Sequence, residues 1–253
     1  MSERTSDHGR IGPPPPDTLV SLDSEVVECR RCPRLVAWRE EVAANPRASF
    51  RGERYWGRPV PGFGDPDAEI LIVGLAPAAH GANRTGRMFT GDRSGDWLYA
   101  ALHRAGFANQ PTARSANDGL RLDRVRVTAA VHCAPPANKP TTVERDRCSP
   151  FLAREIQILQ PSVFVVLGGF AYQALWRLLR EEGVTLPSPR AAFGHGAEVR
   201  LDSMGSAAAT ILCCYHPSQQ NTFTGRLTEE MLDDVFTRAR ELADGEAASG
   251  DDR

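Results

Sequence analysis

Asp92, Asn138 and His216 are the side chains of this sequence best suited by type and position to act on a bound molecule. A carboxylate can accept a proton, an amide can read the edge of a planar ligand, and an imidazole can donate a hydrogen bond. Three Gly- or Pro-rich segments that carry or adjoin them each follow a short apolar run, at 74–81, 131–140 and 215–218. In an open parallel α/β sheet, segments beyond the carboxyl ends of the strands line one ligand crevice. We therefore expect the three residues to converge.

The elements that must position these residues alternate along the chain. Near-continuous apolar runs, typical of strands covered on both faces, occupy 69–74, 125–131, 163–168 and 210–215. Helical periodicity is found over 94–105, 145–159, 171–180 and from Thr228 onward, with a further helix expected near 30–44. This alternation predicts an α/β fold, a three-layer α/β/α sandwich around a mostly parallel four-stranded sheet. We interpret 45–64, which is rich in Gly, Arg and Pro, as an extended surface loop.

Composition predicts one domain in a soluble cytoplasmic protein. We assign 20–243 to a single domain, and the polar segments 1–19 and 244–253 to disordered tails. No run approaches the roughly 18 apolar residues of a membrane span, and the N-terminal segment has no apolar signal core, so we expect no membrane partner. The formal net charge of −2 is not that of a generic nucleic-acid binder. Phosphate contacts would have to come from local groups such as Arg84, Arg87, Arg93, Lys139 and Arg226, which could equally be solvated surface.

Four of the six cysteines are spaced like metal ligands. Cys29 and Cys32 form a Cys-x2-Cys pair, whereas Cys133 and Cys148 are separated by 14 residues. Four thiolates suit either structural zinc or an iron–sulfur cluster. A single tight pair favours a cluster modestly, because zinc sites usually combine two, but spacing alone does not decide the metal. The other two cysteines adjoin one another inside an apolar run and are most simply buried.

Three segments resemble the motifs of one enzyme family. Residues 74–92, 133–140 and 216–222 resemble the first, second and last motifs of the family 5 (UdgB-type) uracil-DNA glycosylases, in the same order. The resemblance implies excision of uracil, and of other deaminated bases such as hypoxanthine, from double-stranded DNA in base-excision repair. We expect a monomer and no lyase step. It also implies a structural 4Fe–4S cluster held by Cys29, Cys32, Cys133 and Cys148.

The chemistry of base excision gives the motif residues their expected roles. Breaking the glycosidic bond leaves a cationic sugar and an anionic base, so negative charge is needed near the sugar and donors near the base. By the resemblance, Asp92 activates the attacking water and His216 donates toward uracil O2. Asp92 could instead cap the helix near Ser94, and His216 could be a packed residue at a strand end. Leu75 stands where family 4 enzymes carry a Glu, which leaves the route of water activation less secure than the activity.

Three further residues would bind the base, which must first be flipped out of the duplex. Asn138 offers a donor and an acceptor to the uracil edge, Phe89 would stack on the ring, and Ala76 would line the pocket floor. Asn138 could equally form a turn before Lys139, and Phe89 could be core. The expected DNA contacts, for which surface exposure is the alternative, are Arg84, Arg87, Ser218, Gln219, Asn221 and Arg226.

Two other functions compete with turnover. One is a non-turnover uracil-DNA-binding protein like the UdgX-type proteins, but these carry a His-containing insertion after the first motif, where 92–96 here runs directly into a helix. The other is a zinc-stabilised nucleic-acid-binding module without catalysis. A lyase step would need an amine nucleophile, and Lys139 is the sole lysine in the chain.

Overall fold

A single mixed sheet organises the computed structural model, which describes residues 17–204 and 207–250. Its strand order is β1–β3–β2–β4–β6–β5. The four inner strands run parallel, and each edge strand is antiparallel to its neighbour. The strands are β1 (Phe63–Gly64), β2 (Ile70–Gly74), β3 (Val125–Ala129), β4 (Val163–Leu167), β5 (Glu198–Met204) and β6 (Ala207–Cys214).

The prediction of four strands misses the two edges. β1 is only two residues long, so it carries no periodic signal. In β5, Val199 and Leu201 are buried while Arg200 and Asp202 are exposed. That alternation is typical of a strand with one solvent-exposed face. The prediction relied on continuous apolar runs, so it missed this strand.

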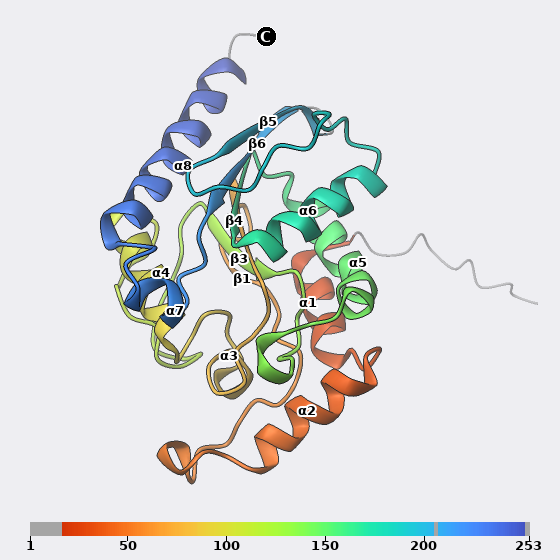
Figure 1. The fold of residues 1–253 in the computed structure, drawn as a ribbon, viewed down its shortest axis with the longest axis vertical. Helices are drawn as coiled ribbons and strands as arrows, with labels where there is room; N and C mark the ends of the chain where they lie inside the picture. The colour runs from red at the N-terminus through yellow and green to blue at the C-terminus, as the bar shows by residue number, and fades with distance from the viewer. Residues whose placement is uncertain (1–16, 205–206, 251–253) are drawn as a thin grey trace, which may run out of the picture.

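Helices cover both faces of the sheet, which confirms the three-layer sandwich (Figure 1). Ile70 and Ile72 of β2 pack on the side of α4 and α8, whereas Leu71 and Val73 pack on the side of α5 and α6. Successive strand residues point to opposite faces, and each face is buried under its own helices. The helices are α1 (Leu19–Glu28), α2 (Pro33–Ala44), α3 (Ala82–Thr85), α4 (Arg93–Arg104), α5 (Thr142–Leu159), α6 (Gly169–Glu181), α7 (Gln219–Phe223) and α8 (Glu229–Gly250), with short 3₁₀ turns η1 (Ala48–Phe50) and η2 (Pro136–Asn138).

The N-terminal region contains two helices where the sequence predicts one. α2 starts at Pro33, whose fixed φ suits the first helical turn, and Cys29 and Cys32 lie in the extended break between α1 and α2. α1 packs against Phe151 of α5, and Leu35 of α2 packs against Val131 beyond β3. Of the predicted tails, 1–16 and 251–253 lie outside the described residues. Leu19 begins α1, and α8 continues to Gly250, so the described part of the second tail is helical.

The segment 45–64 is not the extended surface loop that its composition indicates. Tyr55 and Val60 are buried. Its backbone amides at Trp56 and Gly57 donate to carbonyls of the first motif, and the Val60 amide donates to the His132 carbonyl (2.8 Å). The segment therefore packs against both the first motif and the loop after β3, which periodicity in sequence cannot reveal.

The carboxyl ends of the parallel strands meet along one edge of the sheet. Gly74 pairs with Ala129, and Leu167 pairs with Cys214. The chain continues from β2 to β3 on one side and later places β4 on the other side of β2, so the strand order reverses beside β2. Such a reversal is where open α/β sheets bind ligands.

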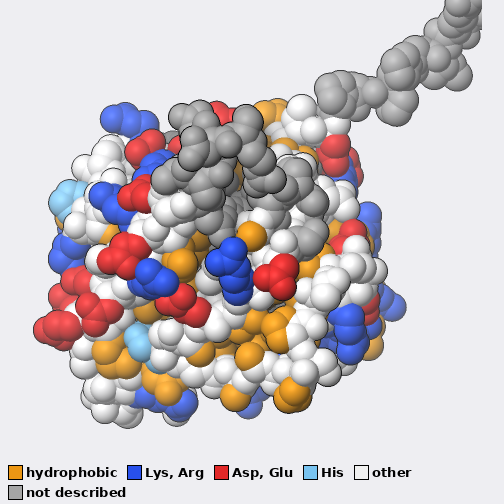
Figure 2. Space-filling view, turned by 90° about the horizontal axis from the view of Figure 1, so that it is seen from above, with side chains coloured by type: hydrophobic (Ala, Val, Ile, Leu, Met, Phe, Trp, Pro, Cys, Tyr) orange, Lys and Arg blue, Asp and Glu red, His pale blue; other side chains and the backbone are white. Residues whose placement is uncertain are grey.

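Surface and hydropathy add two observations. Among the residues that the structure describes, no helix is long and apolar enough to cross a bilayer. On the face seen in Figure 2, basic and acidic side chains are intermixed rather than gathered into one field, in keeping with the formal net charge of −2.

Candidate functional site

A cavity of about 730 Å³ lies beyond the carboxyl ends of β2, β3 and β6. The first motif provides most of its wall, and the segments after β3 and β6 and the η1 region complete it. It brings together seven of the residues predicted from sequence, namely Ala76, Phe89, Asp92, Asn138, His216, Ser218 and Gln219. The expected convergence of the three motifs therefore occurs in the fold.

Asp92 both caps a helix and lines the cavity. It is the N-cap of α4, and its Oδ1 accepts a hydrogen bond from the Gly95 amide at 3.1 Å. The carboxylate also lies against Gly81, where an added Cβ would come within 2.0 Å of Oδ2. Burial raises the pKa of Asp92, and hydrogen bonds from the Gly95 and Ser94 amides oppose that shift. The capping and catalytic interpretations are therefore compatible, because one carboxylate can do both.

Phe89 is fixed in a strained backbone conformation by two glycines. Its φ is 50°, a region that residues with a side chain rarely adopt. A Cβ on Gly74 would lie 2.7 Å from the Phe89 ring, and a Cβ on Gly95 would lie 1.7 Å from its carbonyl oxygen. Such strain persists only where the surroundings enforce it, and it clusters at functional sites. The ring lies 5.9 Å from that of His216, centroid to centroid.

His216 follows β6 and is a neutral imidazole at neutral pH. Burial lowers the pKa of His216 to about 4, so the ring carries one N–H donor and one acceptor. The Asn221 side chain donates to the His216 carbonyl at 2.9 Å, and Ser218 caps α7. Asn221, predicted to contact DNA, thus holds the backbone that carries His216.

Asn138 ends η2 in a left-handed conformation, with φ of 54°, directly after Ala137 with φ of 52°. Its side chain is exposed on the cavity wall. Asn138 therefore does form a turn before Lys139, as the alternative interpretation predicts. Its side-chain amide is at the same time accessible to a ligand.

Arg87 is buried and fully engaged within the chain. Both Nη atoms donate to the Asp118 carboxylate at 2.8 Å, and Nε donates to Thr90 Oγ1 at 2.9 Å. The side chain is 4% exposed. This placement argues against the predicted phosphate contact and makes Arg87 a brace for the first motif.

Arg84 also faces inward. Its guanidinium donates to the His80 carbonyl at 2.8 Å and to the Gly91 carbonyl at 3.1 Å, pairs with Glu53 and lies 4.1 Å from the Phe50 ring. It holds the backbone on either side of the cavity wall instead of facing DNA. Arg226, in contrast, is exposed, with its guanidinium over the Tyr215 ring at 4.6 Å.

Several cavity residues carry no role in the sequence interpretation. His80 and Gln220 stand inside the motifs and could have been singled out there. Arg47 and Phe50 reach the cavity from η1, a segment without any periodic signal. Phe223, at the end of α7, is 70% exposed with the Arg93 guanidinium 5.1 Å from its ring centroid. An exposed aromatic residue beside the cavity is a candidate for contact with a base stack.

The four predicted metal-ligating cysteines line one small apolar cavity. Cys29 and Cys32 come from the α1–α2 break, Cys133 from the loop after β3, and Cys148 from α5. Burial raises the pKa of the Cys133 thiol to about 11 and raises that of Cys148 as well. The buried Arg39 guanidinium lies 3.1 Å from Cys133 Sγ, and the His132 amide lies 3.3 Å from Cys148 Sγ.

The cysteines are not arranged around a single point. Within 17–204 and 207–250, no three His, Cys, Asp or Glu side chains are grouped to hold one metal ion. A zinc ion would draw all four sulfurs to about 2.3 Å from its centre. A four-iron cluster instead places each thiolate on a separate iron. Four thiols are a donor set that a four-iron cluster can use.

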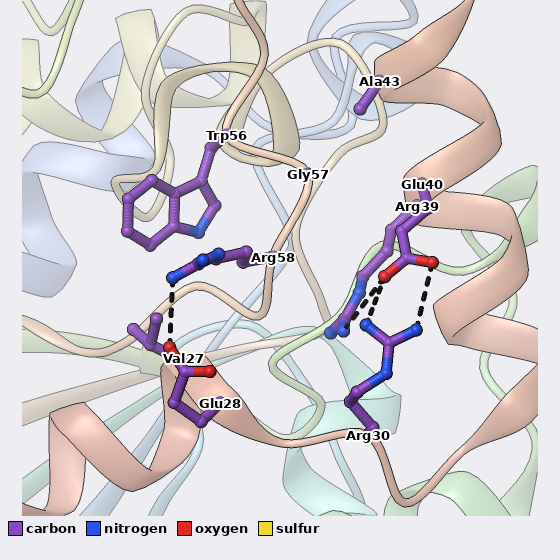
Figure 3. A pocket seen from close by; sticks show the side chains of 9 residues that line it. All are labelled: Val27, Glu28, Arg30, Arg39, Glu40, Ala43, Trp56, Gly57 and Arg58. Atoms are coloured by element: carbon purple, nitrogen blue, oxygen red, sulfur yellow. Dashed lines mark hydrogen bonds and ion pairs between the residues drawn. The ribbon is translucent and has the colours of Figure 1, made fainter.

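A second surface depression, of about 380 Å³, lies between the end of α1, α2 and the Trp56 segment (Figure 3). Its charged side chains are paired with one another: Arg58 with Glu28 at 3.0 Å, and Arg30 with Glu40. Because these partners satisfy each other, we assign the depression no role.

Comparison with known proteins agrees with this geometry. The family model described as "Uracil DNA glycosylase superfamily" matches residues 61–240, and the chain therefore belongs to that superfamily. It is 56% identical over 228 residues to a protein of Mycobacterium bovis named type-5 uracil-DNA glycosylase, covering 89% of this chain and 82% of that protein.

Two further relatives extend the comparison. A type-5 uracil-DNA glycosylase of Thermus thermophilus is 52% identical over 216 residues, covering 85% of this chain and 94% of that protein. A type-4 uracil-DNA glycosylase of Archaeoglobus fulgidus is 30% identical over 184 residues, covering 72% and 81%. The resemblance to family 5 indicated by the motifs is thereby confirmed.

Proposed function

We propose that this protein is a monofunctional DNA glycosylase that excises uracil from double-stranded DNA in base-excision repair. The observation that carries the proposal is the single cavity that gathers Asp92, Phe89, Asn138 and His216. The type-5 relatives are named for the same activity. A cavity of about 730 Å³ also has room for a purine, which supports action on hypoxanthine.

Recognition of the flipped base would rest on stacking and on one amide. The Phe89 ring stacks on the base, and contacts of this kind contribute about 1–3 kcal/mol each. The Asn138 amide matches the adjacent O4 and N3–H groups of uracil, whereas cytosine would leave polar groups unpaired at a cost of about 1–3 kcal/mol.

Excision breaks the bond between sugar C1′ and base N1. The electron pair of that bond leaves with uracil, and a neutral His216 N–H hydrogen-bonds to O2 as negative charge grows there. The Asp92 carboxylate would stabilise the cationic sugar and accept a proton from the attacking water, whose oxygen bonds to C1′. The products are free uracil and an abasic site.

The α7 region would enter the duplex. Phe223 is exposed next to Gln219 and Gln220, which lie on the cavity rim, and apolar wedges of this kind can fill the space left by a displaced base. Arg226 supplies an exposed cation nearby for the backbone.

The cysteine cavity would have a structural role. Cys29, Cys32, Cys133 and Cys148 would hold a 4Fe–4S cluster that ties the α1–α2 break, the loop after β3 and α5 together. Asn138 lies five residues after Cys133, so this tie would also fix the loop that reads the base.

The deciding experiment uses an end-labelled duplex with one uracil opposite guanine. We expect uracil release and strand breakage only after hot alkali, with no break and no borohydride-trapped adduct without it, because Lys139, the only lysine, is not among the residues that line the cavity. Breakage without alkali would show a lyase step. A protein that binds the duplex but releases no base would instead be the non-turnover binder.

A further inference from the structure

The mouth of the large cavity carries positive charge on two sides. Among its lining residues only Arg47, Asp92 and Arg93 are charged. Arg47 is exposed at the N-terminal side of η1 and has no ion-pair partner among the described residues. Arg93, which also lines the cavity, lies beside Phe223. The Arg47 side is not used by the base recognition or bond cleavage described above.

His80 lines the same cavity as Arg47 and is hydrogen-bonded to Tyr55. The Tyr55 hydroxyl lies 3.0 Å from His80 Nδ1. The phenol has a single proton, which it can donate to Nδ1. Nδ1 is then the acceptor, and the remaining proton of a neutral ring must sit on Nε2.

With that proton on Nε2, the His80 ring can act as a hydrogen-bond donor. Burial lowers the pKa of His80, and the charges of Arg47 and Arg84 add to that effect, so the ring is neutral. An imidazole N–H without its own charge, beside an unpaired guanidinium, is a donor set for an anion. Asp92 adjoins His80 through Gly81 but belongs to the sugar-facing wall.

We propose that Arg47 and His80 bind one DNA phosphodiester next to the flipped nucleotide, with Tyr55 as the positioning residue for His80. The inference rests on the proposed action on DNA and extends it to a phosphate site supplied by the segment 45–55. The ligand must be an anion that accepts two hydrogen bonds, and the phosphates flanking the extruded sugar have that chemistry.

The test replaces single phosphates of a uracil duplex by neutral methylphosphonates and measures affinity by fluorescence anisotropy, with base release recorded separately. For the wild type we expect one flanking position to lose about tenfold in affinity. Arg47→Gln and His80→Asn should each weaken the unmodified duplex several-fold. Each variant should lose less further affinity than wild type when that same phosphate is neutralised, because one of its two contacts is already gone.

Salt dependence separates the two side chains. Arg47→Gln should flatten the slope of log affinity against log salt by about 1, whereas His80→Asn should leave it unchanged because the ring is neutral. Tyr55→Phe, which keeps the packing, should weaken binding in the same direction as His80→Asn. Arg51→Gln and His103→Asn are matched controls outside the cavity lining and should behave as wild type.

The proposal would be overturned if each variant and each methylphosphonate lowered the affinity independently, with additive losses at every phosphate position. A fall in the rate of base release by His80→Asn at unchanged affinity would also overturn it, since His80 would then act in the chemistry. A wild type that binds with the expected coupling but releases no base would refute the glycosylase activity and leave the phosphate site intact. Thermal unfolding of each variant shows that the fold is retained.

Discussion

The large cavity beyond the sheet and the small cavity between the cysteines both bury ionisable groups, but the surroundings compensate for burial differently. In the large cavity, backbone amides of Gly95 and Ser94 partly offset the rise in the Asp92 pKa. His216 has no such compensation, and its pKa falls to about 4. In the small cavity, the Arg39 guanidinium and the His132 amide face Cys133 and Cys148, and burial raises the pKa of both thiols.

This difference indicates separate tasks. In the proposed mechanism, a neutral imidazole donor and a carboxylate that can take up a proton serve base excision near neutral pH. Thiols whose pKa is raised by burial become thiolates beside a compensating positive charge, which the proposed cluster would supply. We therefore expect substitutions in the large cavity to lower the rate of base release, and substitutions of the four cysteines to lower the free energy of unfolding.

The largest expected effect is that of Asp92→Asn, which should reduce base release by about 10²–10⁴-fold. Asn still caps a helix, so the fold should be kept. Because the folded pKa of Asp92 lies above its unfolded value, the ionised carboxylate costs stability at pH 7. The variant should therefore unfold at the same temperature as wild type or higher, measured by thermal denaturation. Equal rates for both proteins would move water activation elsewhere.

His216→Leu should reduce base release by about 10²–10³-fold, the usual loss for one donor to a developing anion. The folded pKa near 4 lies below the unfolded value of about 6.5, so wild type loses stability as the pH falls through that range. Leu has no titrating group, and melting temperatures from pH 7 to 4 should fall less in the variant. An identical acid dependence would contradict the assigned pKa.

The pH dependence of the rate sharpens the contrast within the large cavity. An acid limb from protonation of Asp92 should appear above the usual carboxyl range, since burial raises that pKa. His216 should contribute no limb between pH 5 and 8. Single-turnover rates across this range test both statements, and a limb near pH 6.5 that disappears in His216→Leu would show a ring less buried than described.

In the small cavity, Cys148→Ser should remove visible absorption and lower the free energy of unfolding by more than about 2 kcal/mol. Cys213→Ser is the matched control. Its thiol is also buried, but it lies in β6 away from the four-cysteine cavity, so the visible absorption should be kept. A soluble, colourless and fully active Cys148→Ser protein would contradict the structural role of the cluster.

The smallest effect concerns the rim. Phe223→Ala should slow excision from duplex DNA by about tenfold, because one stacking contact is lost, and should slow single-stranded substrate less. Val143→Ala, an exposed apolar residue at the start of α5, serves as control and should not change either rate. Equal slowing on both substrates would argue against a wedge in the stack.

The amino-acid sequence by itself determined the parallel strands, the motifs beyond their carboxyl ends and the family. These features are local: a run such as 163–168 is apolar because both its faces are covered, and a motif keeps its spacing wherever it lies. The position of Thr228 as the cap of α8 could be predicted for the same reason, and its hydroxyl accepts a hydrogen bond from the Met231 amide at 3.2 Å.

Only the tertiary structure decided which polar side chains face the ligand. Arg84, Arg87 and Arg226 look alike in sequence, yet Arg87 is neutralised by Asp118 and Arg84 by Glu53, while Arg226 stays exposed. The same holds for 45–64, which becomes a wall of the cavity through contacts with distant segments. Burial and ion pairing depend on what packs from elsewhere in the chain, and local pattern carries no information about that.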